Sequence, residues 1–116
     1  MKESKPVIFG SGASSSKDFK SLYINCHAAL TNGITRFDTA PSYATEEVLS
    51  QAVQQSANEL GLKRSDYQIQ TKIDPIQMYN GKVVEYFKRK LETMRLDYID
   101  SLLIHWPVLK LSLIHI

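Results

Sequence analysis

The sequence contains a single cysteine, Cys26, among its 116 residues. One thiol cannot form a disulfide within the chain, so the fold does not belong to the small disulfide-stapled classes. The absence of structural disulfides is compatible with a reducing cytosol, and we predict a cytoplasmic location. Cys26 falls within a predicted helix, where we expect a packed thiol rather than a reactive one.

Targeting and membrane-spanning segments are also lacking. Residues 1–5 are polar and do not resemble a secretion signal. The longest apolar run lies at the C-terminus, is interrupted by His105, Pro107 and Lys110, and is too short to cross a bilayer. Lysine and arginine residues are not clustered and the net charge is only +2, so we predict no nucleic-acid or membrane partner.

Two common kinds of catalytic site find no support in the sequence. His27, His105 and His115 do not have the spacing of metal ligands, and the single cysteine has no partner ligand. We therefore predict no metal site. The G-x-S-x-G sequence of serine hydrolases does not occur either.

Four short apolar runs alternate with three segments of helical periodicity. The predicted strands cover residues 6–9, 34–38, 67–71 and 101–104, and the helices lie between them. Strand ends recur roughly every 30 residues, as βαβ units require, because parallel strands need a helical crossover. The pattern predicts an α/β fold, either an open doubly wound sheet or part of a (β/α)₈ barrel. Periodicity alone leaves both architectures open.

Residue types predict the helix boundaries and the buried faces. Asp18 is placed to open the first helix and Gly33 to end it, whereas the second helix begins near Thr45 and ends at Gly61. We also expect the strand at residues 6–9 to be buried. The apolar positions expected to face the core are Phe19, Leu22, Tyr23, Cys26, Ala29, Leu30, then Leu49, Ala52, Val53, Leu60, and then Val84, Phe87, Leu91, Met94.

An acid, a lysine and a histidine close three successive apolar runs: Asp38, Lys72 and His105. If the runs are neighbouring parallel strands, these side chains converge at the carboxyl edge of the sheet, where both architectures carry ligand chemistry. The loop after Asp38 delivers Tyr43 to the same edge. A nearby ammonium favours the phenolate form of a tyrosine, and an acid can hold a buried lysine. The set is suited to donating a proton to an oxygen on which charge develops.

Each of these residues also has a structural interpretation. Tyr43 could pack at a surface, Asp38 and Lys72 could form a solvated ion pair, and His105 could be structural. Gly10-Ser11-Gly12 after the first strand offers a different function, because it resembles half of a dinucleotide-binding fingerprint. However, the third glycine position is occupied by a serine, and Asp38 lies later than the usual interval of about 20 residues.

The sequence resembles the aldo-keto reductase family from about residue 6 to residue 107. The intervals between Asp38, Tyr43, Lys72 and His105 fit the catalytic tetrad of that family. The matching motifs are Gly33-Ile34-Thr35-Arg36-Phe37-Asp38-Thr39-Ala40, Tyr43-Ala44-Thr45-Glu46, Thr71-Lys72-Ile73 and Leu96-Asp97-Tyr98-Ile99-Asp100-Ser101-Leu102-Leu103-Ile104-His105-Trp106-Pro107.

This resemblance implies a (β/α)₈ TIM barrel that reduces aldehydes or ketones by hydride transfer from NADPH. In that reaction Tyr43 would donate the proton, Lys72 would favour its phenolate, and Asp38 would hold Lys72. His105 would orient the carbonyl group of a small-molecule substrate, and Trp106 would line the substrate pocket. The resemblance also places Asp38 beside the cofactor. It identifies no protein partner.

Several positions depart from the family pattern. Ser50 stands where the second helix of the family usually carries glycine, and Thr45 replaces an asparagine. Gly12-Ala13-Ser14 replaces the common Gly-Thr-Trp after the first strand, so an aromatic wall of the substrate pocket is not expected. These departures affect the expected substrate preference and leave the expected chemistry unchanged.

The chain is short for a complete barrel, which takes about 250 residues. We expect residues 1–110 to form the N-terminal half of an aldo-keto reductase barrel, with about four strands and three helices. Residues 111–116 match a translated sequencing adapter, and we exclude them from the fold. We expect this chain to be inactive by itself. The alternatives are a non-catalytic, regulatory or binding subunit with the same fold, and an inactive half-barrel.

Overall fold

The structure is a computed structural model that describes residues 5–12, 17–43, 45–74 and 81–105. The predictions for Trp106 and for residues 111–116 lie outside this part of the chain. Two short 3₁₀ turns, η1 (Pro41–Tyr43) and η2 (Arg64–Asp66), accompany the main elements. In chain order these elements are β1 (Ile8–Gly10), α1 (Phe19–Thr31), β2 (Arg36–Asp38), α2 (Glu46–Glu59), β3 (Gln68–Ile73), α4 (Val83–Met94) and β4 (Ser101–Ile104).

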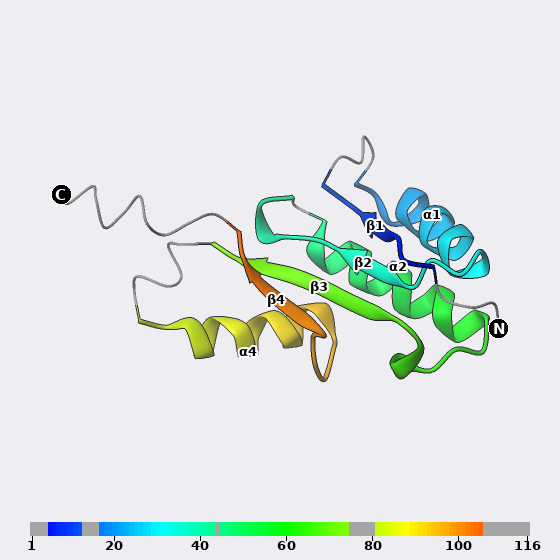
Figure 1. The fold of residues 1–116 in the computed structure, drawn as a ribbon. Coiled ribbons are helices and arrows are strands. Elements are labelled where there is room, and N and C mark those ends of the chain that lie inside the picture. The colour runs from blue at the N-terminus through cyan, green and yellow to red at the C-terminus, as the bar shows by residue number, and fades with distance from the viewer. Residues whose placement is uncertain (1–4, 13–16, 44, 75–80, 106–116) are drawn as a thin grey trace.

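All four strands are parallel, and they lie in the sheet in the order β1-β2-β3-β4 (Figure 1). A doubly wound sheet reverses its strand order at a switch point, whereas the strands of a barrel follow one another in chain order. The observed order therefore confirms the predicted α/β class, with four parallel strands and three helices arranged as in half of a barrel. It does not support the doubly wound alternative.

The helix boundaries confirm most of the sequence prediction. The Asp18 carboxylate accepts a hydrogen bond from the Ser21 amide at 2.9 Å and so caps α1. Gly33 and Gly61 follow α1 and α2 with φ angles of 84° and 74°, a left-handed conformation that glycine adopts without strain. No helix among the described residues is long and apolar enough to cross a membrane.

The buried apolar side chains form one cluster between the helices and one face of the sheet. Phe37 and Ile69, at the centre of the sheet, are fully buried against residues from α1 and α2. Cys26 is also fully buried, and burial raises the pKa of its thiol to about 12. The thiol therefore stays protonated and unreactive at neutral pH, as predicted.

Several apolar positions that were predicted to be buried are exposed instead: Val7, Ile8, Phe19, Leu60 and Val84. Ile8 in β1 is 50% exposed, because β1 pairs only with β2 and forms one edge of the described sheet. Val84 is 66% exposed, because it lies in the first turn of α4, ahead of the stripe that packs inward. That stripe includes Met94, as predicted, and also Lys90, which is 5% exposed.

Lys90 is buried together with a charge partner from another helix. Its Nζ atom lies 2.6 Å from Glu46 Oε2, and the Lys90 side chain is only 3% exposed. The same carboxylate oxygen accepts a hydrogen bond from the Thr71 hydroxyl of β3. One carboxylate at the start of α2 therefore connects α4 to the central strand that carries Lys72.

Ser50 strengthens the contact between the same two helices. Its hydroxyl donates to the Met94 carbonyl at 2.7 Å, and the Gln54 amide donates to that carbonyl at 3.0 Å. Met94 lies in the last turn of α4, where carbonyl groups have no partner within the helix. The serine at this position of α2 therefore has a structural role.

At the amino edge of the sheet, Arg64 joins β3 to β4. Its guanidinium group donates to the carbonyls of Tyr67 and Tyr98 and to the Asp100 carboxylate at 2.7–3.0 Å. The same carboxylate accepts the Ile69 amide at 2.8 Å. This edge is tied together by ion pairs and backbone contacts, as expected for the structural end of a barrel.

We predict that Lys90→Met destabilises the fold by about 3 kcal/mol, because it leaves the Glu46 carboxylate without its buried counter-charge. Urea unfolding of the full-length gene product would measure the change. The double variant Lys90→Met with Glu46→Gln should recover much of the loss, since a neutral amide needs no counter-ion. Lys88→Met, at an exposed position of α4, is the matched control. Equal unfolding midpoints for the Lys88 and Lys90 variants would contradict this account.

Candidate active site

The structure brings three of the predicted residues to the carboxyl edge of the sheet. Asp38 ends β2, Lys72 is the second-last residue of β3, and His105 directly follows β4. These strands are parallel neighbours in the sheet. Tyr43 ends η1, the short turn between β2 and α2. The predicted convergence is therefore observed, whereas Trp106 lies outside the described residues.

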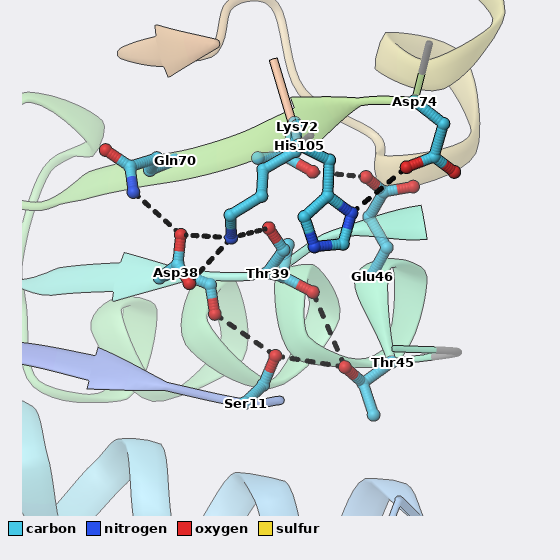
Figure 2. Close-up of polar contacts among 10 residues, drawn as sticks. Ser11, Asp38, Thr39, Thr45, Glu46, Gln70, Lys72, Asp74 and His105 are labelled. Carbon is cyan, nitrogen blue, oxygen red and sulfur yellow. Dashed lines mark hydrogen bonds and ion pairs between the residues drawn. The ribbon is translucent and has the colours of Figure 1, made fainter. Parts of the chain in front are cut away.

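The Lys72 ammonium group donates hydrogen bonds to three oxygen atoms (Figure 2). Its Nζ atom lies 2.8 Å from both carboxylate oxygens of Asp38 and 3.0 Å from the Thr39 carbonyl. The two charged side chains are only 12% and 20% exposed, so this is not a solvated surface pair. A buried ammonium needs such partners, and here the partners also fix its position.

Tyr43 is placed between this lysine and the histidine. Lys72 Nζ lies 4.9 Å from the centre of the Tyr43 ring, within the range of a cation–π contact. The His105 ring meets the Tyr43 ring edge to face, at 5.5 Å between centres and an angle of 87°. The carbonyl of Tyr43 accepts a hydrogen bond from Lys17 Nζ at 2.8 Å, which anchors the turn to the segment before α1.

Two further side chains at this edge were missed by sequence reasoning. Gln70 donates its amide to Asp38 Oδ1 at 2.7 Å, and Asp74 Oδ1 lies 3.0 Å from His105 Nδ1. Both contacts are drawn in Figure 2. Gln70, Lys72 and Asp74 are alternate residues, and alternate residues of a strand point to the same face. Gln70 and Asp74 could therefore have been identified from the sequence by their two-residue spacing from Lys72.

Buried hydroxyl groups connect β1 to the same edge. Ser11 donates both its amide and its hydroxyl to the Asp38 carbonyl at 3.1 Å. The Thr45 hydroxyl donates to Ser11 Oγ at 3.0 Å and lies 3.4 Å from the Thr39 hydroxyl. The second helix begins near Thr45, as predicted, because α2 starts at Glu46, although the Thr45 side chain makes no capping hydrogen bond. Its hydroxyl is used instead in this chain of contacts.

The Ser11 contacts also bear on the dinucleotide-binding alternative. Ser11 is fully buried, and both of its donors are used by the backbone of the neighbouring strand. Asp38 binds Lys72 with both carboxylate oxygens. In a dinucleotide-binding fold that acid would instead accept a ribose hydroxyl. Ser11 and Asp38, which belong to the possible dinucleotide-binding motif, are therefore used here for contacts between strands and for holding Lys72.

The arrangement has a defined chemical capacity. The Tyr43 ring lies beside a fixed ammonium and a carboxylate-bound imidazole at the end of a parallel sheet. A fixed positive charge stabilises the phenolate that remains after a tyrosine has donated its proton. An imidazole beside it can hold an oxygen atom in place. The site can thus deliver a proton to an oxygen and stabilise the change in charge.

We predict that Gly12→Ala displaces the Tyr43 ring. A Cβ atom on Gly12 would lie 2.9 Å from Tyr43 Cζ and 3.0 Å from Cε2, closer than unbonded carbon atoms approach. The ring can move without unfolding the sheet, so a crystal structure should show it shifted away from residue 12, with changed distances to Lys72 and His105. Gly10→Ala is the matched control, because a Cβ atom there meets nothing within 4 Å. An unmoved ring in the Gly12 variant would refute the prediction.

Comparison with known proteins adds independent evidence. The family model described as the aldo/keto reductase family matches residues 6–115. The chain is 32% identical over 110 residues to an aldo-keto reductase of Mycobacterium avium, covering 95% of this chain and 37% of that protein. It is 35% identical over 79 residues to methylglyoxal reductase DkgB of Yersinia pestis, covering 68% of this chain and 28% of that protein.

Solved structures agree with the sequence relatives. The aldose reductase of Schistosoma japonicum superposes with a TM-score of 0.75 at 31% identity, over 88% of this chain and 33% of that one. A putative 2,5-diketo-D-gluconic acid reductase B gives a TM-score of 0.71 at 28% identity, over 86% and 33% of the two chains.

Each match covers a much larger share of this chain than of the related protein. The matches take up most of this chain, but the chain spans only about a third of the length of these relatives. Within that third, the parallel sheet, the four residues at its carboxyl edge and the match over residues 6–115 agree. The chain belongs to the aldo/keto reductase family.

Proposed function

We propose that these residues supply the proton-donating part of an NADPH-dependent reductase of aldehydes or ketones. One observation carries the proposal: Lys72 is fixed by Asp38 at 2.8 Å and lies 4.9 Å from the ring of Tyr43. An ion pair that served stability alone would not need a tyrosine above it. The alternative structural interpretation of Asp38 and Lys72 as a solvated pair does not fit their low exposure.

The side chains of the site would divide the reaction as follows. Tyr43 donates its hydroxyl proton to the carbonyl oxygen of the substrate. Lys72 stabilises the phenolate that Tyr43 becomes, and Asp38 keeps Lys72 in position. His105 holds the carbonyl oxygen near the tyrosine, and Trp106 lines the substrate pocket beside it. The substrate is a small-molecule carbonyl compound.

The donor set fits a nicotinamide cofactor. The described side chains at this edge can donate a proton and hold an oxygen, but no side chain of a protein carries a hydride. A bound nicotinamide supplies that hydride to the carbonyl carbon. Asp38 is the described residue that would lie beside it. The choice of NADPH over NADH rests on the family resemblance.

The proposed activity concerns the full-length gene product, because the chain spans only about a third of its relatives. We propose that residues 1–110 form the first part of the reductase barrel and that residues 111–116 are not part of it. Relatives include an NAD(P)H-dependent 6'-deoxychalcone synthase of Glycine max, 33% identical over 93 residues. Because the related enzymes are named for different substrates, the carbonyl substrate of this protein has to be identified by experiment.

We predict that Tyr43→Phe lowers kcat for aldehyde reduction at least about 100-fold, since it removes the proton donor but keeps the ring. NADPH oxidation with a panel of aldehydes would measure the rate in the full-length gene product. NADPH binding, followed by its fluorescence, should persist in the variant. Tyr98→Phe is the control, because Tyr98 precedes β4 at the opposite edge of the sheet.

Other results would have distinct meanings. A fully active Tyr43→Phe variant would exclude Tyr43 as the proton donor. NADPH binding without reduction of any aldehyde in the wild type would favour the non-catalytic subunit. Equal rates with NADH and NADPH would overturn the proposed cofactor preference.

A further inference from the structure

The Asp38 carboxylate has unequal support from the two strands beside it. In β3 the register partner of Asp38 is Gln70, whose Nε2 atom donates to Asp38 Oδ1 at 2.7 Å. In β1 the register partner is Gly10, which has no side chain, and a Cβ atom there would meet nothing within 4 Å. In the described part of the chain, the carboxylate is therefore held on the β3 side and has room to turn on the β1 side.

The ion pair with Lys72 does not by itself fix the position of the carboxylate. Lys72 lies two residues beyond Gln70 on the same face of β3 and contacts both Asp38 oxygens at 2.8 Å. Its ammonium ends a flexible four-carbon chain, so the two charges could stay paired while both shift toward β1. Gln70 instead holds Oδ1 from directly across the strand pair. Figure 2 shows Gln70 and Lys72 reaching the acid from the same strand.

We propose that Gln70 is a positioning residue that keeps the Asp38 carboxylate turned toward β3, and thereby keeps the Lys72 ammonium beside the Tyr43 ring. The Lys72 Nζ atom lies 4.9 Å from the centre of that ring. The kinetic consequence of this inference rests on the proposed function, in which Lys72 stabilises the phenolate of Tyr43. A displaced ammonium slows proton donation, and it leaves the binding of substrate in the ground state unchanged.

A purely space-filling role for Gln70 makes a different prediction. Gln70 is half-buried, as Lys72 is, so its side chain also occupies volume on this face of the sheet. Methionine has a similar length and flexibility but no N–H group to donate. Glutamate has nearly the same shape as glutamine but presents two acceptor oxygens to Asp38. Both substitutions are tolerated if Gln70 only fills space, and neither is tolerated if its N–H group holds the acid.

We expect Gln70→Met to lower kcat for aldehyde reduction about tenfold in the full-length gene product, the effect of one lost hydrogen bond to a charged group. KM for the aldehyde and the affinity for NADPH should not change. Gln70→Glu should lower kcat at least about 100-fold, because a second carboxylate repels Asp38 and competes for Lys72. Gln68→Met is the matched control, since Gln68 lies on the same face of β3 but is exposed. A wild-type kcat in both Gln70 variants would overturn the proposal.

A double-variant comparison tests whether Gln70 acts through Asp38. In the Asp38→Ala background there is no carboxylate to hold, so adding Gln70→Met should change the residual rate by less than about twofold. A space-filling side chain would instead cost the same factor in both backgrounds. Thermal melting of each variant shows whether it is folded. Equal losses with and without Asp38 would overturn the proposal.

A crystal structure of the Gln70→Met variant tests the same inference without substrate or activity. We expect the Asp38 carboxylate to be turned toward Gly10, and Lys72 Nζ to lie more than about 6 Å from the centre of the Tyr43 ring, beyond the range of a cation–π contact. An Asp38 carboxylate in its wild-type position would overturn the role of Gln70. A wild type that reduces no carbonyl compound would instead overturn the proposed function. In that case the crystal structure alone decides whether Gln70 positions Asp38.

Discussion

The structure of this site depends on one ion pair, between Lys72 of β3 and Asp38 of β2. The ammonium group contacts both oxygens of the carboxylate at 2.8 Å and the Thr39 carbonyl at 3.0 Å. These contacts lock the two central strands together at their carboxyl ends. They also leave a fixed positive charge beneath the Tyr43 ring. A charge that is both buried and paired can be placed with a precision that a solvated lysine does not have.

Several weaker contacts keep that pair and its neighbours in register. Gln70 holds Asp38 from within β3, and Ser11 holds the Asp38 backbone from β1. Glu46 binds both Thr71 and Lys90, so the start of α2 is fastened to the strand that carries Lys72. The site is therefore supported by hydrogen bonds from both neighbouring strands and from the helix layer.

Much of the fold was predictable, because it follows from local patterns. Alternating apolar runs and helical faces predicted the βα order, and Asp18, Gly33 and Gly61 marked helix ends by their own chemistry. Burial was predicted less well at the margins of the sheet. Ile8 has the residue type of a core strand but lies at an edge, and Lys90 is buried although lysine is usually exposed. In both cases the outcome depends on neighbours that are distant in the sequence.

The sequence by itself determined the family, the parallel α/β class and the set Asp38, Tyr43, Lys72 and His105. These follow from residue types at fixed intervals, which are written in the chain. Only the tertiary structure decided that Gln70 meets Asp38, that Asp74 meets His105, and that the Thr45 hydroxyl binds Ser11. Such contacts join residues of different strands and helices, and their geometry exists only after the sheet has formed.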